Sequence, residues 1–190
     1  MRRVVPALRA PEPGSAVAID ESLEFRPVRI ALLTVSDSRT LSDDRSGDTL
    51  SERITGDGHI LADRALCRDS VAEIVSRLHG WALRDDVDVV ITTGGTGVTG
   101  RDVTPEALAQ LDGKDIPGFG ELFRWISFGK IGTSTIQSRA CAIVSHGTFI
   151  FALPGSTGAV KDGWDEILRH QLDSRFRPCN FVELMPRLSE

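Results

Sequence analysis

The sequence is poor in the residues that cross-link small secreted domains through disulfides or that bind zinc. It has three cysteines, Cys67, Cys141 and Cys179, and no two of them have the CxxC spacing. Its four histidines are scattered along the chain without the spacing of zinc ligands. We therefore expect reduced, mostly structural thiols, no zinc site and a cytoplasmic protein.

The chain also lacks an apolar segment suited to a membrane. Its first residues are basic, but they contain no apolar stretch like that of a secretory signal peptide. The segment 140–160 carries no charge, yet His146-Gly147 predicts a turn within it and Pro154-Gly155 a break. We expect two short strands and a loop there, and no membrane partner.

An excess of basic residues is missing as well. The formal net charge is -5, whereas proteins that bind nucleic acid usually carry a basic excess or a basic face. This argues against nucleic acid as the main partner. It leaves open small anionic ligands, because they need only a local site.

The composition that remains is that of one globular domain. The chain has 190 residues, of which 41% are hydrophobic and 26% charged. Residues 1–26 are rich in proline and predict a disordered or extended N-terminal tail. Residues 27–190 are expected to form the single folded domain.

Apolar patterns along this domain predict alternating strands and helices. Strands are expected at 29–35, 60–67, 87–92, 141–145 and 148–153, and helices at 47–57, 71–82, from 104 onward, 119–128 and 156–172. Ser70 with Glu73 predicts a capping box, and Thr104 before Pro105 predicts another helix start. The alternation indicates an α/β fold, a three-layer α/β/α sandwich with a mostly parallel central sheet.

A glycine-rich loop, TTGGTGVTGRD at 92–102, directly follows the third of these strands. Glycine allows the backbone to approach a ligand, so that successive N–H groups can point at phosphate oxygens. The loop formally contains GxGxxG, but it follows the third strand and its helix begins late, which argues against a dinucleotide oxidoreductase. No GxxxxGK[ST] motif is present. The other interpretation is a tight turn without a ligand.

Several polar segments follow the predicted strands. In an open parallel sheet, ligands bind outside the carboxyl ends of the strands. Those ends lead to Ser36-Asp37, to Asp69, to the glycine loop with Asp102, and to Pro154-Gly155-Ser156. We therefore expect glycines, hydroxyls and carboxylates to converge at one edge of the sheet.

The carboxylates of Asp69 and Asp102 would repel a phosphate unless a cation lay between them. Mg²⁺ suits this position because it binds through one or two carboxylates plus substrate phosphates. Asp69 could instead complement a helix start, and Asp102 could shape the loop; Asp37 is balanced between a turn and the site. The basic candidates near these loops are Arg39, Arg101, Arg139 and Lys161.

Three separated motifs, GGTGVTGRDVTPEAL (94–108), IPGFGELFR (116–124) and FALPGS (151–156), resemble the molybdopterin-binding domain shared by MogA, MoaB and gephyrin-type proteins. The similarity is co-linear from about 29 to 181. RIALLTVSDSR (29–39), ISFGKIGTSTIQSRA (126–140) and RPCNF (177–181) resemble the MoaB branch. The residues 1–26 lie outside the similarity.

The resemblance implies a trimer or a dimer of trimers acting late in molybdenum cofactor synthesis, alongside other enzymes of that pathway. Catalytic members adenylylate molybdopterin with Mg-ATP. Asp69 and Asp102 match the two catalytic, metal-binding aspartates. The ligand-binding residues that it implies, together with those at the strand ends, are Ser36, Asp37, Thr93, Gly94, Gly95, Thr96, Gly97, Ser138, Arg139, Pro154, Gly155 and Ser156.

Two other functions remain open beside the adenylyltransferase. The B branch is not uniformly catalytic, so the chain could bind molybdopterin as a scaffold without consuming ATP. A hydrolase or deamidase of pyridine nucleotides can use a similar domain, although such proteins usually carry an additional C-terminal domain.

Overall fold

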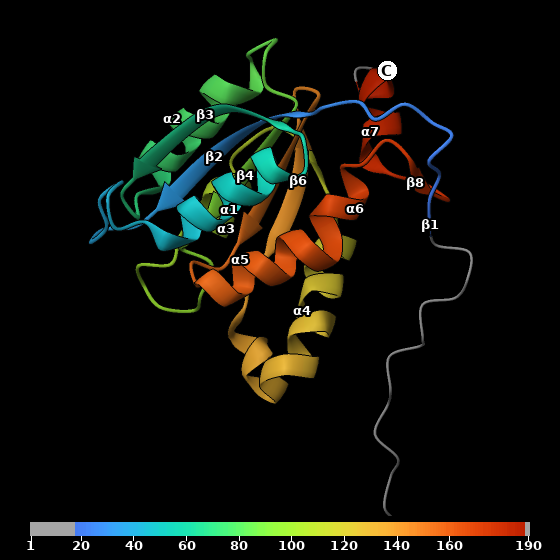
Figure 1. The fold of residues 1–190 in the computed structure, drawn as a ribbon. Coiled ribbons are helices and arrows are strands. Elements are labelled where there is room, and N and C mark those ends of the chain that lie inside the picture. Colours follow the sequence, from blue (N-terminus) through green and yellow to red (C-terminus); the bar gives the residue numbers. More distant parts are fainter. Residues whose placement is uncertain (1–17, 189–190) are drawn as a thin grey trace, which may run out of the picture.

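Six strands form a mixed sheet in the order β3-β2-β4-β7-β6-β5 in the computed structural model, which describes residues 18–188 (Figure 1). The strands are β2 (Arg29–Val35), β3 (Ile60–Cys67), β4 (Val89–Thr93), β5 (Lys114–Asp115), β6 (Cys141–Ser145) and β7 (Thr148–Leu153). β3, β2, β4 and β7 run parallel, whereas β6 and β5 continue the sheet in antiparallel pairs. The mostly parallel sheet and the hairpin at His146-Gly147 are both confirmed.

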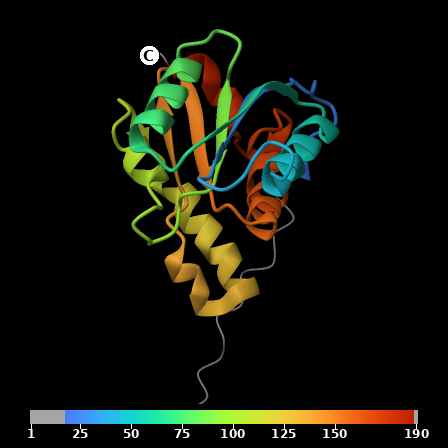
Figure 2. The ribbon, with the colours of Figure 1, turned by 90° about the vertical axis from the view of Figure 1, so that its left-hand side faces the viewer.

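Helices cover both faces of this sheet, as Figure 2 shows. One face carries α1 (Arg45–Gly56), α4 (Pro117–Ile131) and α5 (Thr157–Gly163), the last continued by the π-helical turn η2 (Trp164–Leu168) and α6 (Arg169–Gln171). The other face carries α2 (Val71–Ala82) and α3 (Thr104–Leu108). The predicted three-layer sandwich is therefore confirmed.

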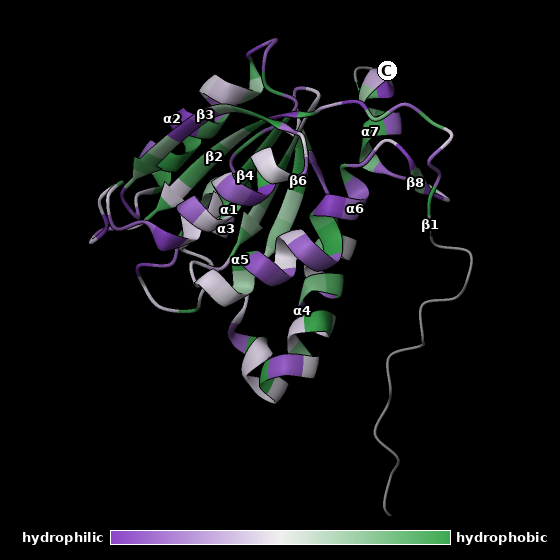
Figure 3. Cartoon of the chain, in the orientation of Figure 1, coloured by the Kyte–Doolittle hydropathy of each residue, from purple (hydrophilic) through white to green (hydrophobic). Residues whose placement is uncertain are grey.

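Each face of the sheet has its own apolar core, and Figure 3 shows the strands of the sheet coloured largely as hydrophobic. Ile91 of β4 lies in the first core with Trp164, and Val90 lies in the second with Ile74 and Leu78. Successive side chains of a strand point to opposite faces. All five residues of β4 are buried, which explains why Val89, Val90 and Ile91 follow one another without an exposed polar residue between them.

Two predicted helix caps are wrong in detail. Ser70 stands at the N-cap of α2, but its side chain makes no capping hydrogen bond, and the Glu73 carboxylate accepts instead from the Arg68 amide at 3.3 Å. Thr104 is the first residue of α3 rather than its cap, because its hydroxyl donates to the Gly94 carbonyl at 2.8 Å. Tertiary contacts with the glycine loop thus replace a local cap.

The first described segment packs beside a segment close to the last described residues. β1 (Ala18–Ile19) pairs antiparallel with β8 (Phe176–Arg177) in a separate two-stranded sheet, and α7 (Phe181–Leu184) and η3 (Met185–Arg187) follow.

Most of the predicted tail, residues 1–17, lies outside the described residues. Between 18 and 188, no helix has both the length and the apolar character needed to cross a membrane. The three cysteines are free, as expected.

Candidate functional site

The carboxyl ends of β2, β4 and β7 open onto a cavity with a volume of about 450 Å³. Ten of the predicted site residues line it: Ser36, Asp69, Gly94, Gly95, Thr96, Gly97, Asp102, Pro154, Gly155 and Ser156. They come from four separate loops. Parallel strands bring these loops together because their carboxyl ends share one edge of the sheet.

The glycine loop lies directly against the end of β2. The φ angle of Gly94 is 108°, and a Cβ on this residue would lie 2.1 Å from the Val35 carbonyl oxygen. Gly95, with a φ of 64°, would place a Cβ 2.4 Å from the hydroxyl oxygen of Thr104. Only glycine fits both the backbone conformation and the space at these positions. These glycines are required by close contacts within the protein; the approach of the loop to a phosphate stays a prediction.

A second loop, Pro154-Gly155-Ser156, is held against the glycine loop by hydrogen bonds. The Gly94 amide donates to the Leu153 carbonyl at 3.0 Å, and the Thr93 hydroxyl donates to the Pro154 carbonyl at 3.2 Å. Thr93 is buried and does not line the cavity. Its place in the fold is that of a support for the two loops, rather than the ligand contact that we expected.

Asp69 follows β3, and its half-buried side chain points into the cavity beside the glycine loop. Burial raises the pKa of its carboxyl group, and the nearby charge of Asp37 raises it further. Among the residues that the structure describes, no cation forms an ion pair with Asp69. A carboxylate in this state favours a bound cation.

Asp102 closes the glycine loop. One of its carboxylate oxygens accepts from the Thr99 amide at 2.8 Å and from the Thr99 hydroxyl at 2.7 Å. Burial opposes the charged form, but these hydrogen bonds outweigh it and lower the pKa of Asp102. Asp102 therefore favours the negatively charged form in the cavity that it shares with Asp69, and it also shapes the loop.

The two carboxylates fit a hard cation better than a soft one. Mg²⁺ accepts oxygen ligands from one or two carboxylates and completes its shell with phosphate and water. Within residues 18–188 no group of three or more His, Cys, Asp or Glu side chains is arranged for a metal ion. A cation here would thus depend on ligand oxygens as well as on Asp69 and Asp102.

Arg139, one of the predicted ligand-binding residues, does not line the cavity and holds the glycine loop from outside it. Its guanidinium donates to the Gly97 carbonyl at 2.6 Å and to the Asp102 carbonyl at 2.7 Å, and it pairs with Glu106. Ser138 does not line the cavity either; its hydroxyl accepts from the Ala140 amide at 3.3 Å. The segment before β6 supports the site rather than forming its surface.

Two arginines, Arg39 and Arg101, reach the cavity. Both were candidates by their position near loops, although neither was among the site residues that we singled out. Asp37, which was, does not line the cavity; it forms an ion pair with Arg101 at 2.5 Å and accepts from the Asp69 amide at 3.2 Å. Lys161, the remaining candidate, does not reach the cavity.

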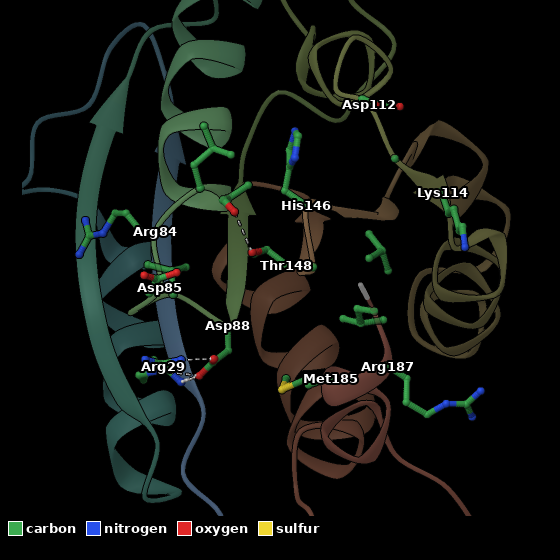
Figure 4. A pocket seen from close by; sticks show the side chains of 17 residues that line it. Arg29, Arg84, Asp85, Asp88, Asp112, Lys114, His146, Thr148, Met185 and Arg187 are labelled. Carbon is green, nitrogen blue, oxygen red and sulfur yellow. Dashed lines mark hydrogen bonds and ion pairs between the residues drawn. The ribbon is translucent and has the colours of Figure 1, made fainter. Parts of the chain in front are cut away.

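A larger hollow of about 930 Å³ lies at the opposite end of the sheet (Figure 4). Its charges are partly paired, since Arg29 pairs with Asp88 at 2.5 Å and Arg84 pairs at 2.8 Å with Asp86, which does not line the hollow. It has no loop of consecutive glycines and no convergence of strand carboxyl ends. We therefore assign the functional site to the smaller cavity, on chemistry rather than size.

Known proteins resemble this chain over nearly its whole folded part. A family model described as "Probable molybdopterin binding domain" matches residues 31–174. Molybdenum cofactor biosynthesis protein B of Escherichia coli K12 is 49% identical over 160 residues, which cover 84% of this chain and 94% of that protein.

Solved structures give the same picture. A crystal structure of a molybdenum cofactor biosynthesis protein B superposes with a TM-score of 0.77 at 37% identity, covering 86% of this chain and 97% of that one. The tungsten cofactor synthesizing protein MoaB from Pyrococcus furiosus superposes with a TM-score of 0.71 at 30% identity, covering 87% and 99%. The similarity seen in the sequence motifs thus extends to the fold.

Proposed function

The chain belongs to the molybdopterin-binding domain family, and we propose that it adenylylates molybdopterin during molybdenum cofactor biosynthesis. In this reaction a terminal phosphate oxygen of molybdopterin attacks the α-phosphorus of ATP. A new P–O bond forms, the bond to the β-phosphate breaks, and pyrophosphate leaves. Such a transfer needs positioning and charge neutralisation rather than a covalent enzyme intermediate.

The observation that carries this proposal is the shared cavity of the glycine loop, Asp69 and Asp102. The loop offers a close backbone surface for phosphate oxygens. The two carboxylates would hold Mg²⁺, which would neutralise charge on the phosphates. A site that only bound pterin would not need two carboxylates beside a phosphate loop.

The two loops give each substrate a place. The backbone of Gly94, Gly95 and Thr96 lies between the carboxyl end of β2 and the loop that follows β7. One phosphate group can therefore sit on the glycine loop while the other approaches from the Pro154-Gly155-Ser156 side. Holding both phosphates in a fixed relative position is the main source of rate enhancement available to this site.

Release of pyrophosphate tests the proposal. Purified protein given Mg-ATP and molybdopterin should release pyrophosphate, and Asp102→Ala should abolish the release. Asp112→Ala is a matched control, because Asp112 lines the hollow at the opposite end of the sheet. Binding of molybdopterin without any binding of ATP would favour the scaffold function, and unchanged turnover in Asp102→Ala would refute the mechanism.

A homo-oligomer is part of the same proposal. The aromatic residues of α4 divide between core and surface, since Phe119 and Phe123 are buried whereas Trp125 and Phe128 are exposed by 48% and 54%. Leu122, Ile131 and Ile136, in and directly after the same helix, are exposed as well. Patches of this kind often mark protein interfaces. Light scattering should show a trimer or hexamer, and a monomer would contradict this part of the proposal.

A further inference from the structure

The cavity contains two arginines that are held in very different ways. The Arg39 guanidinium donates to the Ser46 hydroxyl at 2.8 Å and to the Gly155 carbonyl at 3.1 Å. Both of these partners are neutral, the carboxylate of buried Asp44 lies 3.9 Å from Arg39 Nη1, and 35% of the Arg39 side chain is exposed. Arg39 is thus a fixed positive charge that keeps the β2–α1 segment against the Pro154-Gly155-Ser156 loop.

The hydrogen bonds of Arg101 go to an exposed carboxylate instead. Its Nε and Nη2 atoms donate to the same Asp37 oxygen, at 2.8 and 2.5 Å, and 69% of the Arg101 side chain is exposed. An ion pair this exposed contributes little to stability, because water screens it and both side chains lose rotational freedom. Arg101 can therefore exchange its partner at low cost.

Asp37 connects this ion pair to the proposed catalytic carboxylates. Its other oxygen accepts from the Asp69 amide at 3.2 Å. This hydrogen bond fixes the Asp37 carboxylate beside Asp69, and Arg101 partly neutralises the charge of that carboxylate. Moving Arg101 away would increase the negative potential at Asp69, where a cation would bind.

We propose that Arg101 is paired with Asp37 only in the absence of ligand, and that it leaves Asp37 to bind the polyphosphate of the nucleotide. The ligand class is a di- or triphosphate, including the pyrophosphate product. The planar guanidinium can donate two parallel hydrogen bonds to phosphate, which is a stronger arrangement than its contact with one carboxylate oxygen. The exchange would add positive charge at the phosphates and strengthen the cation site together.

This inference rests on the proposed function, since it assigns Arg101 to the nucleotide of that reaction. The competing interpretation is a surface ion pair that only tethers the glycine loop to the β2–α1 segment. The two interpretations predict opposite changes in ligand affinity when Asp37 is replaced. Loss of a tether weakens ligand binding whichever partner is removed, whereas loss of a competing carboxylate strengthens it.

Calorimetric titration with Mg-pyrophosphate and with Mg-α,β-methylene-ATP separates them. Arg101→Gln should weaken binding of both probes roughly 10-fold or more, because a charged hydrogen-bond donor to phosphate is lost. Asp37→Asn should tighten binding roughly 2- to 5-fold, the range expected for an exposed ion pair that no longer has to break. Arg101→Lys should fall between wild type and Arg101→Gln.

Arg26→Gln serves as the charge-matched control, because Arg26 does not line the cavity. Thermal unfolding of all variants should match that of wild type, since both residues of the ion pair are exposed. Equal affinity of Arg101→Gln and wild type, or weaker binding by Asp37→Asn, would overturn the inference alone. Wild-type protein that binds neither probe would overturn the adenylyl transfer together with it.

Discussion

Replacing Gly94 by alanine tests how the glycine loop is held against the sheet. The added Cβ would lie 2.1 Å from the Val35 carbonyl oxygen, and the φ of Gly94 is 108°. Because that carbonyl belongs to buried β2, the loop has to move. Overpacking costs about 1–3 kcal/mol, and the backbone conformation adds roughly 1–3 kcal/mol. We expect a loss of about 2–6 kcal/mol in the free energy of unfolding.

This loss should appear as a fall in melting temperature. For a domain of this size, 1 kcal/mol corresponds to about 2–4 °C, so Gly94→Ala should melt roughly 5–20 °C below wild type. The displaced loop should also bind Mg-ATP at least about 10-fold more weakly, since a shift of this size misaligns the phosphate contacts. Circular dichroism and calorimetric titration measure the two effects.

Gly100→Ala is the matched control in the same loop. A Cβ at Gly100 would meet no heavy atom within 4 Å, and its φ does not lie in the left-handed region. The free energy of unfolding of this variant should lie within about 1 kcal/mol of that of wild type. Equal melting temperatures for Gly94→Ala and Gly100→Ala would refute the argument that close contact with β2 dictates glycine in this loop.

Three further predictions concern charged side chains. Arg139→Lys loses the fork that binds the Gly97 and Asp102 carbonyls, so hydrogen exchange of the loop amides should accelerate; unchanged exchange would argue against this role. Asp69→Asn should melt above wild type at neutral pH, because a raised pKa means that the fold disfavours the charged form. That gain should vanish in acid, where the carboxyl group is protonated in both states, and a gain that persisted there would contradict the assignment. Buried Asp44 is ion-paired with Arg64 at 3.1 Å, and its hydrogen bonds outweigh burial and lower its pKa. Asp44→Asn should therefore cost about 3–5 kcal/mol at neutral pH, and denaturation curves should show this deficit shrinking as the pH falls.

The sequence predicts the secondary structure well where apolar patterns are strong. β2, β3 and the hairpin of β6 and β7 have the predicted bounds. The helix caps were predicted less well. The Thr104 hydroxyl serves the Gly94 carbonyl instead of capping α3, and a contact between loops of this kind leaves no local pattern in the sequence.

The sequence predicts which loops meet at the candidate site, but not which charged side chains face the cavity. The strand-end rule brings Asp69, Asp102 and the glycine loop into one cavity. It does not say which way a long side chain turns. Arg101 belongs to the glycine loop and faces the cavity, whereas Arg139 comes from the segment before β6 and lies behind that loop. That choice depends on which carbonyls and carboxylates lie within reach once the chain has folded.

The hairpin turn at His146-Gly147 has a practical consequence. It joins β6 to β7 at the end of the sheet away from the loops that follow β2, β4 and β7. Figure 4 shows His146 on the rim of the other hollow, and its side chain is exposed. Exposed turns of this kind tolerate inserted sequence. A peptide tag or a fluorophore placed there would allow the protein to be immobilised or followed without touching the phosphate cavity.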